Sequence, residues 1–224
     1  MLETITAFLD WFGVCVFAIT GALVASRKKM DIVGFALLGS VTGIGGGTIR
    51  DVLLGLTPVF WVQKPAYLIT CIVVSCATFL GAGFMHSRYR YLLWFDAVGL
   101  ALFAVTGASI ALSHGAGATI AIAMGVATAT FGGIIRDILG GESPVILSRE
   151  IYVTAALLGA GTYVGLAVLG AGQDLALVTG FVCALALRSA ALAWQLSLPR
   201  YQPRRDQNLN ELCICQLEES RDRA

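Results

Sequence analysis

The sequence predicts an all-α membrane protein of seven transmembrane helices, six of which form an inverted repeat. Three observations predict this fold. Of the 224 residues, 57% are hydrophobic and only 13% are charged, whereas a soluble domain carries about 25% charged residues. Seven apolar stretches are long enough to cross a bilayer, which takes about 20 residues. Residues 10–59 align without a gap on residues 96–145. The composition excludes a water-soluble globular protein.

The seven predicted spans follow from the apolar stretches and from the turns between them. Residues 66–85 contain no charged side chain, and His114 is the only ionisable side chain between residues 97 and 135. Two spans must fit in that second region, so "SHGAG" at 113–117 predicts the turn between them. The N-terminus lacks a basic region followed by a small-residue cleavage site, so we interpret it as a span and not as a signal peptide. The predicted spans are residues 5–25, 32–55, 66–86, 91–113, 117–139, 151–171 and 175–197.

Basic residues in the predicted loops indicate how the chain is oriented. The first loop reads "RKKMD", the third reads "HSRYR", Arg149 lies in the fifth, and five arginines lie in the tail. On the other side, Lys64 in the second loop is the only lysine or arginine. Because cytoplasmic loops carry an excess of Lys and Arg, we expect the N-terminus outside and the C-terminus in the cytoplasm.

The repeat relates two halves of the chain by a shift of 86 residues. Nineteen of the 50 aligned positions are identical, and the identities include Asp, Arg and Pro, which membrane spans do not share by composition alone. Equivalent positions are three spans apart, so the two copies have opposite orientations in the membrane. Such inverted repeats are typical of transporters and channels with a path at the repeat interface. The equivalent charged pairs are Asp10/Asp96, Arg50/Arg136 and Asp51/Asp137.

The repeat divides the chain into four parts. Residues 1–90 form the first three-helix repeat, 91–172 the second, inverted repeat, 173–197 the seventh transmembrane helix, and 198–224 a polar cytoplasmic tail. The tail has two prolines, five arginines and five acidic residues, and we interpret it as a solvated end. No grouping of Ser, His, Asp or Cys predicts an enzyme, and the cysteine spacing predicts neither a disulfide framework nor a metal site. The net charge of +1 does not favour nucleic acid as a partner.

Glycines cluster in the second and fifth predicted spans, near mid-depth. Glycine costs a helix about 1 kcal/mol relative to alanine, so Gly45, Gly46 and Gly47 in one span and Gly132 and Gly133 in the other predict two broken helices. Irregular backbone at that depth must be buried in protein or line a wet cavity. We therefore expect these glycines, with the adjacent Thr48 and Phe131, to line a path along which bare carbonyls replace part of a cation's hydration shell. The alternative is close helix packing at small residues, without a path.

Charges follow the glycines in both spans. An arginine at the bilayer centre costs about 2.5–3.5 kcal/mol on insertion scales, so these arginines need partners or water. We expect one ion pair within each repeat, at equivalent positions, with the remaining aspartates at or near the mouths of the path. The alternative is that the pairs only fix helix register. The expected pairs are Asp10–Arg50 and Asp96–Arg136, and the expected mouth residues are Asp51 and Asp137.

One further arginine lies in the seventh predicted span, outside the repeat. Arg188 follows the apolar run "FVCALAL". A long basic side chain in a span either reaches a polar interior or extends along the helix to the membrane surface. The sequence leaves both alternatives open.

Two spans with "GG-x-x-R-D" in an inverted three-plus-three repeat, followed by a seventh span, resemble the prokaryotic branch of the trimeric intracellular cation (TRIC) channel family. The resemblance covers residues 5–197. It implies a homotrimer in the plasma membrane with a pore in each protomer, lined by the kinked second and fifth spans, that passes potassium and sodium. It implies no cofactor beyond the permeant ions, and membrane lipid, including a bound anionic lipid, as a further partner. The second copy departs from the pattern with Phe131, which weakens the expected break or plugs the path.

Two other function classes remain open. Sequences with the "GGG-x-x-R-D" pattern are also described as possible glycine transporters, for which broken-helix ends with Arg50 or Arg136 would bind a carboxylate. The third class is a membrane scaffold without transport, in which the charges serve as register devices.

Overall fold

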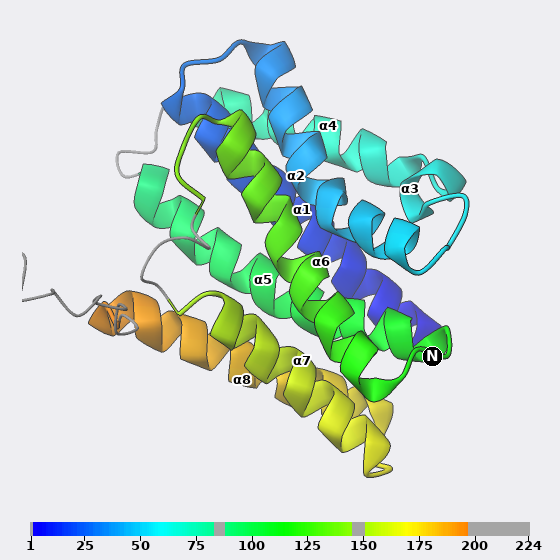
Figure 1. Ribbon diagram of the computed structural model, residues 1–224. Coiled ribbons are helices and arrows are strands. Elements are labelled where there is room, and N and C mark those ends of the chain that lie inside the picture. The colour runs from blue at the N-terminus through cyan, green and yellow to red at the C-terminus, as the bar shows by residue number, and fades with distance from the viewer. Residues whose placement is uncertain (1, 83–87, 145–150, 197–224) are drawn as a thin grey trace, which may run out of the picture.

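The computed structural model describes residues 2–82, 88–144 and 151–196, so the predicted polar tail lies outside the described residues. The described part is helical throughout, with short connections (Figure 1). Its helices are α1 (Leu2–Arg27), α2 (Ile32–Leu53), α3 (Phe60–Gln63), α4 (Ala66–Gly81), α5 (Arg88–Ser113), α6 (Ala118–Leu139), α7 (Val153–Val168) and α8 (Gln173–Trp194). The predicted all-α class is confirmed.

Seven of these helices coincide with the seven predicted spans, and α3 is an additional single turn. By length and composition, α1, α2, α5, α6 and α8 are able to cross a membrane. The helices α4 and α7 have 16 residues each among those described, which is short of a full crossing. The seven-span count therefore stays a prediction, whereas the helical repeat does not depend on it.

The helices pack as two similar units with one helix added. In the first unit α1 packs against α2 and α4, and in the second α5 packs against α6 and α7 (Figure 1). The units meet along two pairs of equivalent helices, α1 with α5 and α2 with α6. The last helix, α8, packs on α5 and α7, so the seventh predicted span adds to the second unit alone.

The contact between α1 and α5 is reciprocal, which shows that the units are inverted. A Cβ atom placed on Gly13 would lie 3.0 Å from the ring of Phe103, and one placed on Gly99 would overlap the ring of Phe17. Gly99 and Phe103 are the repeat equivalents of Gly13 and Phe17, and the two rings meet edge to face at 5.0 Å. Because residue numbers rise on one helix as they fall on the other, α1 and α5 are antiparallel. The predicted inverted repeat is confirmed.

The glycines of α2 and α6 are closely packed helical residues and not helix breaks. Both helices are continuous through residues 45–47 and 132–133. A Cβ on Gly46 would overlap the carbonyl oxygen of Thr128, and one on Gly132 would lie 2.7 Å from that of Thr42. These contacts are again repeat equivalents. The predicted breaks are wrong, because the glycines let two intact helices approach backbone to backbone, and their carbonyls stay within the helices.

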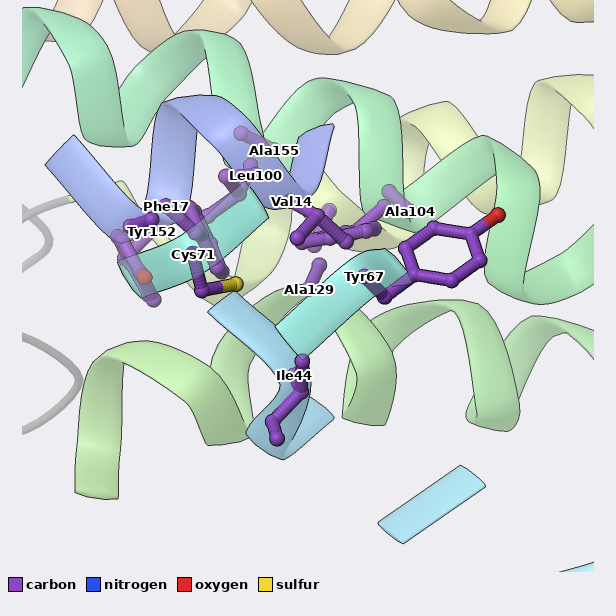
Figure 2. Packing of buried hydrophobic residues seen from close by; sticks show 13 residues of the cluster. Val14, Phe17, Ile44, Tyr67, Cys71, Leu100, Ala104, Ala129, Tyr152 and Ala155 are labelled. Atoms are coloured by element: carbon purple, nitrogen blue, oxygen red, sulfur yellow. The ribbon is translucent and has the colours of Figure 1, made fainter. Parts of the chain in front are cut away.

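An apolar cluster fills the centre of the molecule between the two units. It includes Val14 and Phe17 of α1, Ile44 of α2 and Leu100 of α5, all buried (Figure 2). Two tyrosines, Tyr67 and Tyr152, lie at opposite ends of this cluster in Figure 2. The core thus separates two regions in which polar groups gather.

Loops that the sequence places on one side of the membrane meet at one end of the molecule. The Arg27 guanidinium at the end of α1 donates to Glu142 after α6 at 2.9 Å and lies 4.8 Å from the ring of Tyr89 in α5. At the other end, Lys64 after α3 and His114 after α5 line the same cavity. This grouping matches the predicted loop sides, and the assignment of one side to the cytoplasm stays a prediction.

The α2–α6 contact gives a test of glycine packing. We expect Gly46→Ala to lower the stability of the folded protein by about 1–3 kcal/mol, since added volume in a packed contact forces the backbones apart. The matched control is Gly165→Ala in α7, where an added Cβ meets nothing within 4 Å and alanine favours the helix. Thermal unfolding of the purified protein in detergent measures both. Equal melting temperatures for Gly46→Ala and wild type would contradict the packing role.

Candidate functional site

Buried charged residues gather in two clusters at opposite ends of the antiparallel α1–α5 pair. Both clusters combine side chains from several helices, and every aspartate and arginine in them is at least 92% buried. The first cluster consists of Asp10, Arg50, Asp51, Phe60 and Tyr67. The second cluster consists of Asp96, Arg136, Asp137, Tyr152 and Arg188. A charge buried in a membrane protein faces the interior and has partners, so the partners of each group decide what the clusters do.

In the first cluster Arg50 pairs with its neighbour along the chain. Its Nε and Nη2 atoms donate to Oδ1 of Asp51 at 2.9 and 2.7 Å. The other carboxylate oxygen of Asp51 accepts from the backbone N–H of Phe60 at 2.8 Å. The predicted Asp10–Arg50 pair is wrong, since no ion pair joins these two described residues within 4.0 Å. The backbone N–H of Phe60, at the start of α3, fixes Asp51, and Asp51 in turn binds the guanidinium of Arg50.

Asp10 is held by a tyrosine that no sequence motif marks. The hydroxyl of Tyr67 in α4 interacts electrostatically with the Asp10 carboxylate. Trp11 stacks on the Tyr67 ring at 4.2 Å between centroids, and Phe60 meets it edge-on at 5.0 Å. Trp11 and Phe60 therefore fix the Tyr67 ring, and with it the hydroxyl beside Asp10.

The first cluster lines a cavity of about 450 Å³. Asp10, Arg50 and Asp51 face it, together with Lys64, and His114 from the turn between α5 and α6 completes the wall. Both repeats therefore contribute to the cavity. The buried groups are two carboxylates and one guanidinium, a formal charge of −1, while Lys64 is solvent-exposed and its charge is screened by water.

In the second cluster Arg136 binds two carboxylates. Its Nη1 donates to Oδ1 of Asp96 at 2.7 Å and its Nε donates to Oδ1 of Asp137 at 2.8 Å. The expected Asp96–Arg136 pair is present, with both side chains fully buried. Asp137 is expected at a mouth of the path, but it is buried against Arg136. The second cluster thus ties α5 to α6, whereas the Arg50–Asp51 pair lies within α2.

Arg188 of α8 belongs to the second cluster. Its side chain is fully buried, its guanidinium lies 5.1 Å from the centre of the Tyr152 ring, and its Nη1 donates to the carbonyl of Ile151 at 3.4 Å. Of the two alternatives for this residue, extension to the membrane surface is wrong. Because α8 lies outside the repeat, the first cluster has no equivalent of Arg188, and the second cluster holds two aspartates and two arginines with no net charge.

The remaining predicted residues have structural contacts. Thr48 donates to the carbonyl of Ile44 at 2.7 Å and accepts from the indole of Trp61 at 3.0 Å, which ties α3 to α2. Phe131 is 37% exposed, so it lies on the surface of the protomer and not in the buried interior. The predicted glycines Gly45, Gly46, Gly47, Gly132 and Gly133 are all buried.

Sequence reasoning missed the aromatic partners of these charges. Tyr67 and Tyr152 each follow a connecting loop at the start of the third helix of a unit, and the repeat shift places Tyr67 within one residue of Tyr152. This near-equivalence is a signal by which Tyr67 and Tyr152 could have been found from the sequence. Phe60 and Trp61 have no such signal, because their repeat equivalents are Ile146 and Leu147.

The sequence matches the family described as "Glycine transporter" twice, over residues 7–82 and 93–168. The two matches are offset by the same 86 residues as the repeat. Among related proteins, a UPF0126 membrane protein of Vibrio cholerae is 42% identical over 89% of this chain and 84% of its own length. The UPF0126 inner membrane protein YadS of Escherichia coli K12 is 41% identical over 87% of this chain and 95% of its own length.

Solved structures of high similarity share the whole helical arrangement. The TRIC trimeric intracellular cation channel orthologue from Rhodobacter sphaeroides is 66% identical, with a TM-score of 0.85 over 86% of this chain and all of that one. A second TRIC cation channel structure is 38% identical, with a TM-score of 0.80 over 89% of this chain and 98% of that one. The chain therefore belongs to the family described as "Glycine transporter", which its sequence matches over both repeats, and to the TRIC channel family, to which its sequence and its fold are both similar.

Proposed function

We propose that this chain is a multi-pass inner-membrane channel for monovalent cations, chiefly potassium and sodium, and that it acts as a homotrimer with one path inside each protomer. The observation that carries the proposal is the pair of buried Arg–Asp clusters at opposite ends of the interface between the repeats. The similar Rhodobacter protein is a trimeric cation channel orthologue, and the Escherichia coli relative is an inner membrane protein. The N-terminus lies outside and the C-terminus in the cytoplasm.

The path runs from the cavity over the first cluster, along the α2–α6 contact, to the second cluster. Its cation preference comes from carboxylates. Asp10 and Asp51 face the cavity with only Arg50 buried beside them, and this formal local charge of −1 attracts cations. We expected bare carbonyls of broken helices to coordinate the ion. Because α2 and α6 are continuous, this part of the expectation is dropped.

Conduction needs a second arrangement of the side chains. Between the clusters the interior is filled by apolar side chains such as Phe17 (Figure 2). The Phe17 ring meets that of Phe103 edge to face. Arg50 and Arg136 therefore act either as struts that neutralise the aspartates or as gates that leave the path when their pairing changes. Arg50 is the more easily displaced of the two, because its partner lies on its own helix.

The second candidate function is transport of a small amino acid. The family description "Glycine transporter" favours it, and an arginine beside an aspartate offers one partner to a carboxylate and one to an amine. A transporter shows saturable uptake of glycine in proteoliposomes, whereas a channel shows unitary currents in potassium solution. A scaffold shows neither, so these two measurements separate all three classes.

The role of Asp10 in cation selection has a direct test. Asp10→Asn removes the negative charge and keeps the shape of the side chain. We expect a smaller unitary potassium current and a reversal potential, in asymmetric potassium chloride, that moves toward the chloride equilibrium potential. The control is Asp174→Asn, the same charge change at an exposed position at the start of α8. Identical reversal potentials for Asp10→Asn and wild type would rule out Asp10 as a selectivity residue.

We expect the second cluster to stabilise the folded protein as well. Arg136→Ala removes the guanidinium that binds Asp96 and Asp137, and breaking a buried pair costs about 3–5 kcal/mol. Arg27→Ala removes a half-exposed partner of Glu142 and costs about 0–1 kcal/mol. Thermal unfolding in detergent compares the two variants. If Arg136→Ala melts no lower than Arg27→Ala, then Asp96 and Asp137 are solvated and the cluster is not a dry ion-pair network.

A further inference from the structure

Three polar atoms of the second cluster converge over Gly133. A Cβ atom placed on this glycine would lie 2.8 Å from the hydroxyl of Tyr152, 3.5 Å from Nη2 of Arg136 and 3.6 Å from Oδ1 of Asp96. These side chains come from α6, α5 and the start of α7, so the convergence is a tertiary feature of the fold. Any residue other than glycine at position 133 would fill the space that they face.

Polar atoms around this space lack partners within the described protein. Nη2 of Arg136, the hydroxyl of Tyr152 and Oδ2 of Asp96 are each buried and make no hydrogen bond to another described residue. Arg136 and Asp96 are fully buried and Tyr152 is 2% exposed. A buried polar group without a hydrogen-bond partner is unfavourable. Two of these unpaired atoms, the Tyr152 hydroxyl and Nη2 of Arg136, face the space over Gly133, and the Asp96 carboxylate borders it through Oδ1. This arrangement indicates a bound partner.

The equivalent position in the first repeat is filled differently. Gly47 is the repeat equivalent of Gly133, and a Cβ there would lie 2.7 Å from the ring of Phe60. The ring of Phe60 occupies the space. The polar opening over Gly133 is therefore specific to the second repeat.

The charges of the second cluster decide what chemistry suits this opening. Two aspartates and two arginines balance, so neither an anion nor a cation is favoured. The unpaired atoms are a guanidinium donor, a carboxylate acceptor and a hydroxyl that does either, which suits a small neutral molecule that both donates and accepts. Buried water typically makes about three hydrogen bonds of this kind.

We propose that the space over Gly133 is a binding site for one water molecule, which accepts from Arg136 Nη2, donates to the Asp96 carboxylate and bonds the Tyr152 hydroxyl. The site stands on geometry and charge alone and does not require the proposed channel function. Within that function, the water gives Arg136 an alternative partner when its pairing with the aspartates changes.

X-ray footprinting tests the site, because radiolysis of bound water generates hydroxyl radicals that oxidise the side chain beside it. In the purified full-length protein we expect oxidation of Tyr152 despite its burial. Tyr163 is the internal comparison, since it is equally buried and its hydroxyl donates to Ser109 at 3.0 Å. We expect Tyr163 to be oxidised at least fivefold more slowly. This comparison needs no variant.

A pair of variants then locates the water. Gly133→Ala fills the space and is expected to remove the oxidation of Tyr152, while Gly165→Ala, where a Cβ meets nothing within 4 Å, leaves it unchanged. Equal, slow oxidation of Tyr152 and Tyr163 in the wild-type protein would overturn the proposal. So would undiminished oxidation in folded Gly133→Ala, or protection of Tyr152 by added glycine, which would assign the site to a zwitterion. None of these readouts depends on ion flux.

Discussion

The pairing of Arg136 with two aspartates is the interaction on which the rest of the structure depends. A fully buried guanidinium in a membrane protein is tolerated only when carboxylates or polar groups surround it. Here Asp96 of α5 and Asp137 of α6 lie 2.7 and 2.8 Å from it. Meeting this requirement fixes α5 against α6 and brings the start of α7, with Tyr152, and α8, with Arg188, to the same place.

Close packing of the two units extends this constraint across the molecule. The reciprocal contacts of Gly13 and Gly99 join α1 to α5, and those of Gly46 and Gly132 join α2 to α6. Since equivalent residues meet across the interface, the glycine contacts near the second cluster have counterparts near the first. The clusters nevertheless differ in charge and in filling, because α3 supplies Phe60 to one and α8 supplies Arg188 to the other.

Much of this arrangement follows from the sequence. The shift of 86 residues predicts the inverted units and the positions of the charges, because equivalent residues must occupy equivalent places. The sequence did not reveal that α2 and α6 stay continuous, since the cost of about 1 kcal/mol per glycine is smaller than the gain from close contact between intact helices. It did not reveal the true partner of Arg50 either, because the repeat cannot show that the N–H of Phe60 fixes Asp51. Arg188 lies outside the repeat, and only the packing of α8 places it.

The central claim is that each protomer contains its own ion path. Recording single potassium channels from trimers that mix wild-type and Asp10→Asn protomers tests it most directly. Separate paths predict up to three independent current steps per trimer, each of either the wild-type or the variant size and never of an intermediate size. A single step whose size falls in proportion to the number of variant protomers would contradict the claim and would place the path on the axis between the subunits.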